Sequence, residues 1–239
     1  MTDELSASVD AHEHAEAKAL DWRPLVDGMT DIQKKVHLSM RHTDDDVRIW
    51  RETLMKQVRD NYAETIRQEV VGIGCPDPGR VYVREGAELK AISNHAGEVS
   101  KGIVNTYNYD LARVIVQIGE AHPRANRNVY AANLWPWEAA RDETKNQIIQ
   151  EAEVGWAVNT AKQAFHAHNA EIRGMAEVVP YPTVCPVCAE YVKGNPYSSM
   201  DALYRKCTLP AHPRCVHSGQ LVKDRKLSRE ECRGLWTGG

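Results

Sequence analysis

Apolar residues recur every three or four positions along most of the chain, which is the spacing of one face of an α-helix. In the segment that starts at Trp22, they stand at Leu25, Met29, Ile32 and Val36. In the next segment, they stand at Ile49, Trp50, Leu54, Val58, Tyr62 and Ile66. The same spacing covers about residues 87–120, and the longest pattern runs from Pro136 to Arg173. These segments predict a helical domain over residues 22–173.

Turn-forming residues separate the predicted helices. Thr43 precedes Asp44–Asp46, and a helix N-terminus favours a Thr cap followed by carboxylates. Binding of a cation by the three aspartates is the alternative, but capping alone accounts for them. Glycines and prolines between Val70 and Gly79 predict a connection, followed by a short strand at 80–83. Gly174 is predicted to end the last long helix.

Charge is unevenly spread, although the net charge of the whole chain is only −3. A chain so close to neutral is not an obvious binder of polyanions. Residues 1–21 are polar, Ala-rich and acidic and predict a flexible arm, whereas the part after Ala189 is basic. No segment has the roughly 20 apolar residues that cross a membrane, and the first residues do not resemble a signal peptide. We therefore expect a soluble, non-secreted protein that contacts no membrane.

Five of the six cysteines lie after residue 180. Without a secretion signal, cysteines are better interpreted as thiols or metal ligands than as disulfides. On this basis Cys75 is predicted to be a lone thiol and Cys232 an inert thiol near the end of the chain. The remaining cysteines belong to one local feature.

That feature consists of two ligand pairs, Cys185-x-x-Cys188 and His212-x-x-Cys215. A Cys-x-x-Cys turn directs two thiolates at one point, and thiolates combined with imidazole favour zinc. Four protein ligands leave no open coordination position, so the predicted zinc is structural rather than catalytic. Residues 174–239 are expected to form a small β-containing zinc lobe with a basic tail.

Other ligand sets remain open. Cys207 and His217 each stand close enough in sequence to replace one of the four ligands, and His217 is the stronger rival. Free or redox-active thiols are the alternative to a metal, but a redox Cys-x-x-Cys needs a βαβ unit that the pattern does not predict. His166 and His168 lie about 200° apart around a helix axis, so they are not expected to share a metal ion.

Two tryptophans, Trp135 and Trp137, flank Pro136 at the predicted start of the longest helix. Packing in the core and contact with a partner protein are the two interpretations of such an apolar group. Because tryptophan is enriched at binding hot spots, both are candidate partner-binding residues. No paired carboxylates, activated nucleophile or open metal site stand out, which predicts that the protein is not an enzyme.

A long helix through 151–173 is followed by Cys185-Pro-Val-Cys188-Ala-Glu190, Gly194 and His212-Pro-Arg-Cys215-Val-His217. In this order and spacing, residues 136–220 resemble the phage head morphogenesis family, the Mu F-like minor head proteins. Many members have a final Cys where this chain has His217, and a basic residue where it has Thr183. The N-terminal half of the chain shows no such resemblance.

The resemblance implies a structural minor head protein of a tailed phage. Such a protein would associate with the portal or the major capsid protein, would reside in the virion, and would pass through the host cytoplasm during assembly. A zinc-stabilised nucleic-acid-binding module is the alternative, because the basic tail suits DNA and packaged DNA would lie nearby in either case. The expected fold is mostly α (α+β), with the arm at 1–21, the helical domain at 22–173 and the zinc lobe at 174–239.

Overall fold

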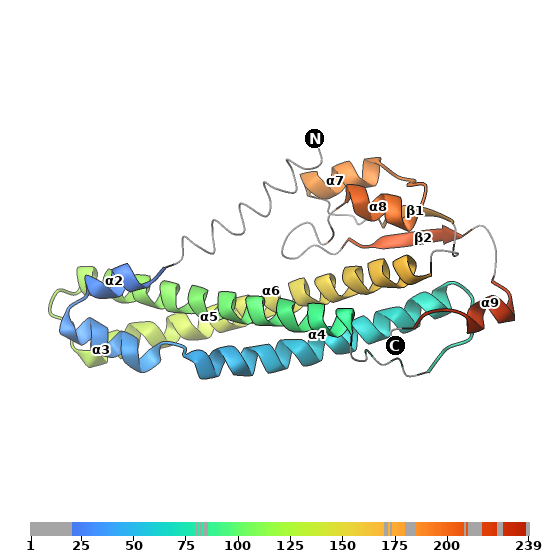
Figure 1. The fold of residues 1–239 in the computed structure, drawn as a ribbon. Helices are drawn as coiled ribbons and strands as arrows, with labels where there is room; N and C mark the ends of the chain where they lie inside the picture. Colours follow the sequence, from blue (N-terminus) through green and yellow to red (C-terminus); the bar gives the residue numbers. More distant parts are fainter. Residues whose placement is uncertain are drawn as a thin grey trace. The chain divides into compact units, whose positions relative to one another are not determined.

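A computed structural model describes residues 21–79, 81, 83, 86–169, 172, 174–179, 185–207, 209, 217–223 and 227–237, apart from the side chains at 142–148, 150, 201 and 223. This part of the chain is mostly helical and contains a two-stranded sheet (Figure 1), as the expected fold class requires. The predicted arm at 1–21 lies outside the described residues, except for Asp21. No helix among the described residues combines the length and the apolar character that a membrane span requires.

The elements follow one another in a simple order. They are α2 (Arg23–Asp27), α3 (Asp31–Met40), α4 (Asp44–Gly72), α5 (Ala87–Ala121), α6 (Arg127–His168), β1 (Gly174–Val178), α7 (Pro186–Lys193), α8 (Met200–Lys206), β2 (Gly219–Lys223) and α9 (Arg229–Arg233).

The chain forms two compact units, and each unit is built from two separate segments. Unit 1 comprises Met1–Leu54 and Asn94–Gln147, and unit 2 comprises Met55–Ser93 and Ile148–Gly239. The three long helices α4, α5 and α6 therefore each contribute to both units. This division differs from the expected boundary between residues 173 and 174, because parts of all three long helices belong with the C-terminal elements.

Unit 1 has an apolar core whose buried members are Met29, Val36, Tyr107, Leu111, Ala112, Ile115, Ile118, Tyr130 and Leu134. The helix expected from Trp22 is interrupted, because Thr30 begins a new helix with a capping box. The backbone N–H and the hydroxyl of Thr30 donate to Oε1 of Gln33 at 2.8 and 3.0 Å. Gln33 also donates to the Ile115 carbonyl at 3.4 Å, which ties α3 to α5.

The predicted cap of α4 is confirmed. The backbone N–H and the hydroxyl of Thr43 donate to Oδ2 of Asp46 at 2.7 and 2.9 Å. The hydrogen bond from the Thr43 backbone holds the pKa of Asp46 below its usual range. One residue earlier, the backbone N–H of His42 donates to Asn108 Oδ1 at 2.8 Å and the His42 carbonyl accepts from Asn108 Nδ2 at 3.0 Å. Asn108 thus joins α5 to the start of α4.

Helix α6 begins earlier and ends earlier than predicted. It starts at Arg127, where the side chain of Asn126 accepts hydrogen bonds from first-turn N–H groups at 3.0 and 3.2 Å. It continues through Pro136, so the proline removes one helical hydrogen bond without ending or starting the helix. Its last residue is His168 rather than Arg173.

The larger apolar core of unit 2 joins the second halves of α4 and α6 to the start of α5. Its buried members are Val58, Tyr62, Ile66, Val70, Ile73, Cys75, Ile92, Ala157, Ala161, Phe165 and Leu235. The apolar stripes predicted for α4 and α6 are confirmed at these positions. Val81 and Val83 pack against the same core but belong to no strand, whereas residues 80 and 82 of the predicted strand are not described.

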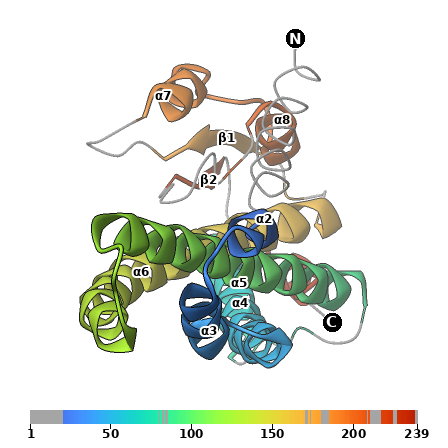
Figure 2. The same ribbon diagram turned by 90° about the vertical axis from the view of Figure 1, so that its left-hand side faces the viewer.

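The sheet of unit 2 consists of antiparallel β1 and β2, with Ala176 opposite Leu221. On its other side, Ala176 exchanges backbone hydrogen bonds with Tyr197 at 2.8 and 2.6 Å. Helix α7 packs against β1 and α8 against both strands, and the strands lie between α7 and α6 (Figures 1 and 2). Gly174 begins β1 instead of ending a helix. A Cβ at this position would lie only 2.7 Å from the Val222 carbonyl oxygen, so the close approach of the two strands requires glycine.

Cys75 and Cys232 form a disulfide between the loop after α4 and helix α9. The expectation that they are separate thiols is wrong. Their Cα atoms lie 5.6 Å apart although 157 residues separate them in the sequence. This is an ordinary separation for a disulfide. Because the pairing depends on a tertiary approach between distant segments, the local spacing of the cysteines gives no sign of it.

Candidate functional site

The Cys185-x-x-Cys188 pair lies at the start of α7. Cys185 is the N-cap of the helix, and its Sγ accepts a hydrogen bond from the Cys188 backbone N–H at 3.3 Å. Pro186 fits the first turn because it needs no N–H partner there. The positive end of the helix dipole stabilises negative charge, and the thiolate is the form of cysteine that binds metals.

The second predicted pair, His212 and Cys215, lies outside the described residues. In the part of the chain that the structure does describe, no group of three or more His, Cys, Asp or Glu side chains could hold a metal ion. The four-ligand zinc site therefore stays a prediction. The donor chemistry present, two sulfur atoms at one helix terminus, is the kind that zinc prefers.

The loop after α7 is tied to β1 by the side chain of Asn195. The backbone N–H of Val178 donates to Asn195 Oδ1 at 2.8 Å, and Asn195 Nδ2 donates to the Val178 carbonyl at 2.9 Å. Tyr197 covers the turn at Gly194, and its hydroxyl donates to the Tyr191 carbonyl at 2.7 Å. These contacts fix the helix that carries the cysteine pair against the sheet.

The two alternative ligands have different surroundings. Cys207 is buried in the small apolar core formed around Ala176, Met200 and Leu203. Its thiol donates to the Tyr197 hydroxyl at 3.1 Å, and burial raises its pKa. In the described structure Cys207 therefore contributes to this small apolar core.

His217 is only 3% exposed and lies two residues before the start of β2. Its carbonyl accepts a hydrogen bond from Nδ2 of Asn159 on α6 at 3.3 Å. His217 is therefore held at a fixed place in the fold by its backbone. Both alternative ligands, Cys207 and His217, stay predictions.

Glu69, Lys162 and His166 form a partly buried polar cluster elsewhere in unit 2. His166 Nε2 is 3.0 Å from Glu69 Oε2, and Lys162 Nζ is 3.6 Å from Glu69 Oε1. Lys162 also donates to the Gly219 carbonyl at 2.8 Å and to Ser218 Oγ at 3.2 Å. Buried ion pairs add little net stability, but their hydrogen bonds specify geometry. This cluster sets the position of α6 against α4 and the start of β2.

The sequence predicts an ordinary histidine at position 166 and draws no attention to Lys162. The sequence does indicate that Lys162 and His166 are neighbours, because they stand four residues apart and thus share one face of α6. Their common partner Glu69 lies on α4, and nothing in the sequence links it to them. As predicted, His168 points elsewhere, and its Nε2 lies 3.1 Å from Glu88 Oε1.

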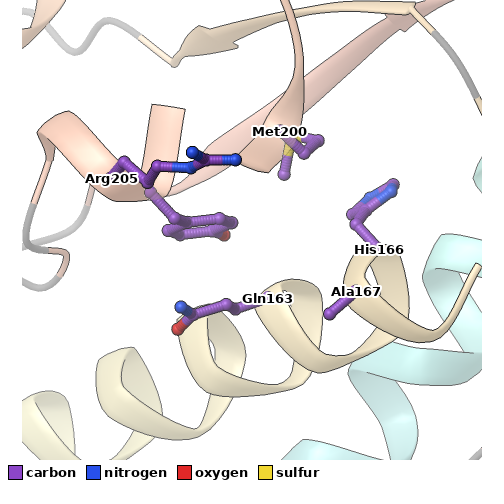
Figure 3. A pocket seen from close by; sticks show the side chains of 6 residues that line it. Gln163, His166, Ala167, Met200 and Arg205 are labelled. Atoms are coloured by element: carbon purple, nitrogen blue, oxygen red, sulfur yellow. The ribbon is translucent and has the colours of Figure 1, made fainter. Parts of the chain in front are cut away.

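A pocket of about 130 Å³ opens next to the polar cluster, between α6 and α8. It is lined by Gln163, His166, Ala167, Met200, Tyr204 and Arg205. Figure 3 shows His166 rising from α6 towards Met200 of α8, while Arg205 reaches across from α8.

Two lining residues carry buried polar atoms. His166 Nδ1 is buried without a hydrogen-bond partner among the described residues, and the Tyr204 hydroxyl is buried beside the backbone of Gly219 without a well-formed hydrogen bond. Leaving such an atom unsatisfied costs about 1–3 kcal/mol. Burial raises the pKa of Tyr204 far above its usual range, so this side chain is a neutral phenol and not a phenolate nucleophile.

The two tryptophans predicted to act together have separate surroundings in unit 1. Trp135 is 77% exposed on α6. Trp137 is half-buried against the unit 1 core. Its ring centroid lies 5.9 Å from the ring centroid of Tyr107 and 5.9 Å from the guanidinium carbon of Arg141. Trp137 is therefore a packing residue, and Trp135 alone keeps the exposure that a partner-binding residue needs.

Comparison with known proteins gives no match to a family model, to a curated protein or to a solved structure at a significant level.

Proposed function

We propose that the protein is a structural minor head protein of a tailed phage. In this proposal it docks on the portal or the inner capsid, assists head assembly or genome delivery, and resides in the virion. The observation that carries the proposal is the order of elements and motifs between residues 136 and 220. There a long helix, a strand, Cys185-Pro-Val-Cys188 and a Gly turn succeed one another, and the described elements α6, β1 and α7 follow that order.

A structural zinc ion belongs to the same proposal. Cys185, Cys188, His212 and Cys215 would hold it, with His217 as the residue that replaces one of them if the set is different. The N-cap position of Cys185 supports this assignment, because a sulfur at a helix N-terminus is well placed to carry negative charge. The metal would hold together a lobe that is built from short strands and short helices.

The disulfide between Cys75 and Cys232 also suits a virion component. Disulfides persist in oxidising surroundings, which include the outside of a released virus particle. A bond closed late in assembly, or after release, reconciles the disulfide with synthesis in the reducing cytoplasm of the host. The exposed indole of Trp135 provides one candidate contact with the portal or capsid protein.

Co-sedimentation tests the proposal directly. The purified chain should sediment with portal complexes or assembled heads, and Trp135→Ala should weaken this association while Trp137→Ala should instead destabilise unit 1. The absence of any affinity for portal, capsid or virion would overturn the proposal.

A zinc-stabilised nucleic-acid-binding module is the second candidate. It is favoured by exposed basic side chains on α8 and α9, namely Arg205, Lys206, Arg229 and Arg233. Affinity for DNA that falls steeply with salt concentration would support it, because the contacts would be with phosphates. Binding to portal or capsid without any affinity for DNA would exclude it.

A further inference from the structure

We propose that the pocket between α6 and α8 binds a small anion that also carries a hydroxyl group, such as phosphate or a 2-hydroxy carboxylate. The proposal stands on six lining residues of unit 2 and does not depend on a role in phage heads. Its lining combines a guanidinium, a carboxamide, an imidazole and a phenol around a space of about 130 Å³. A cavity of about 150 Å³ holds a molecule of the size of benzene, so the pocket suits a ligand of a few heavy atoms.

His166 supplies the most specific part of the argument. Its side chain is only 5% exposed, and Nε2 is engaged by Glu69 at 3.0 Å. With Nε2 committed to the carboxylate, Nδ1 is either a lone pair in the neutral ring or an N–H in the charged ring. Nδ1 is buried and has no partner among the described residues. A ligand with both O–H and ionised oxygen atoms satisfies Nδ1 in either state.

Tyr204 and Arg205 complete the site from α8. The Tyr204 hydroxyl is a second buried polar atom, set beside the backbone of Gly219 without a well-formed hydrogen bond, and its raised pKa keeps it protonated and able to donate. Arg205 reaches over the same space (Figure 3) with the side chain best suited to bind carboxylate or phosphate oxygen atoms.

The charge of the surroundings favours an anion. Glu69 faces the positive charge of Lys162 at 3.6 Å as well as His166, so its negative charge is compensated within the polar cluster. Arg205 brings a positive charge to the pocket, and none of the six lining residues is acidic. A cationic ligand would meet this charge unfavourably.

Titration calorimetry of the full chain with inorganic phosphate, lactate and acetate tests the proposal. Phosphate or lactate should bind, and acetate, which has no hydroxyl for Nδ1, should bind at least about tenfold more weakly than lactate. Binding of phosphate alone identifies the ligand as a phosphate compound, and binding of lactate alone identifies it as a hydroxy acid. No binding by any of the three, or acetate binding as tightly as lactate, overturns the proposal.

Matched variants locate the binding. Arg205→Gln should lower the affinity for the ligand about tenfold or more. Lys206→Gln is the matched control, because it removes the same charge one residue further along α8 and outside the pocket lining. It should change the affinity less than about threefold. Tyr204→Phe should weaken binding with little change in the melting temperature, because the lost hydroxyl makes no well-formed hydrogen bond with the described residues of the free protein. Equal losses of affinity in Arg205→Gln and Lys206→Gln would mean non-specific attraction and would overturn the site.

In the unchanged chain, the ¹⁵N resonance of His166 Nδ1 should shift on binding, and an unmoved resonance would remove this histidine from the site.

Discussion

The side chain of Asn169 pairs with the backbone of Trp236 much as one β-strand pairs with the next. The Trp236 N–H donates to Asn169 Oδ1 at 2.8 Å, and Asn169 Nδ2 donates to the Trp236 carbonyl at 3.2 Å. Asn169 is only 1% exposed, and the ring of His168 stacks on Trp236 with centroids 4.2 Å apart. Together with the Cys232 disulfide, this pairing holds the C-terminal segment, residues 227–237, at two separate places.

Asn169→Ala is expected to lower the free energy of unfolding by about 1–3 kcal/mol. The change removes both hydrogen bonds and leaves the backbone groups of Trp236 to be satisfied in other ways. Urea denaturation measures the loss. Asn133→Ala is the matched control, because Asn133 is an exposed residue of α6 whose side-chain amide donates to the Val129 carbonyl four residues earlier. A loss no larger than that of the control would contradict the role given to Asn169.

Loss of the disulfide is expected to cost about 2–5 kcal/mol of stability under oxidising conditions. Cys75→Ala and Cys232→Ala should each cause this loss, and the double variant should cost little more than either single variant because one bond is removed in all three. Peptide mapping without reductant should recover the two cysteines in one linked fragment. Additive losses, or the two peptides recovered separately from fresh protein, would show that the bond does not form.

The purified protein is expected to contain one zinc ion per chain. Cys185→Ala should release it, whereas Cys207→Ala and His217→Ala should retain it. Cys207 is the cleaner control, since its thiol is buried against Tyr197 in the apolar core. Elemental analysis measures the metal content. Well under half a zinc ion per chain in fresh, unchelated protein would refute the site, and release by His217→Ala would mean that His217 is a ligand.

Trp135→Ala and Trp137→Ala are expected to separate partner binding from packing. Trp135 is largely exposed, so its loss should change the free energy of unfolding by less than about 0.5 kcal/mol. Trp137 packs on Tyr107, and its loss should cost about 3 kcal/mol, near the lower end for tryptophan in a core. Denaturation curves and co-sedimentation with portal complexes measure the two effects. Similar destabilisation by both changes would contradict the distinction.

Asp46→Asn is expected to lower stability at neutral pH, with an effect that disappears in acid. The Thr43 backbone hydrogen bond depresses the folded-state pKa of Asp46 below its unfolded value. The stabilisation is therefore fully present above the unfolded pKa and is lost as the pH falls through the folded pKa. Asp44→Asn is the control in the same helix turn. Denaturation at several pH values measures the difference, and a constant difference between Asp46→Asn and the unchanged chain down to low pH would contradict the assignment.

Local chemistry accounts for the parts of the fold that the sequence predicts well. The spacing of apolar residues predicts α5 and the buried face of α4, and Thr43 with three aspartates predicts the start of α4. These features depend on residues within a few positions of one another. The predicted start of the longest helix at Pro136 is wrong because the helix begins at Arg127 and continues through Pro136, in spite of the hydrogen bond that a proline removes.

Tertiary approach decides the features that the sequence does not predict. Glu69 meets Lys162 and His166 from a different helix, and Cys75 meets Cys232 across 157 residues. Neither partner in such a pair carries a local sign of the other. The Cys185-x-x-Cys188 pair is the opposite case, because its geometry at the start of α7 follows from its own spacing.

The assembly of each unit from two separate segments constrains when the units can fold during synthesis. Domains generally fold as units, and the N-terminal ones fold first as the chain emerges from the ribosome. Unit 1 needs residues up to Gln147, so it has to wait for more than half of the chain, although it begins at the N-terminus. Residues 55–93 emerge long before the segment from Ile148 that completes unit 2, and Cys75 reaches its final partner Cys232 only when synthesis has passed that residue. Unit 2 therefore closes after unit 1 during synthesis, once its C-terminal segment has joined residues that emerged much earlier.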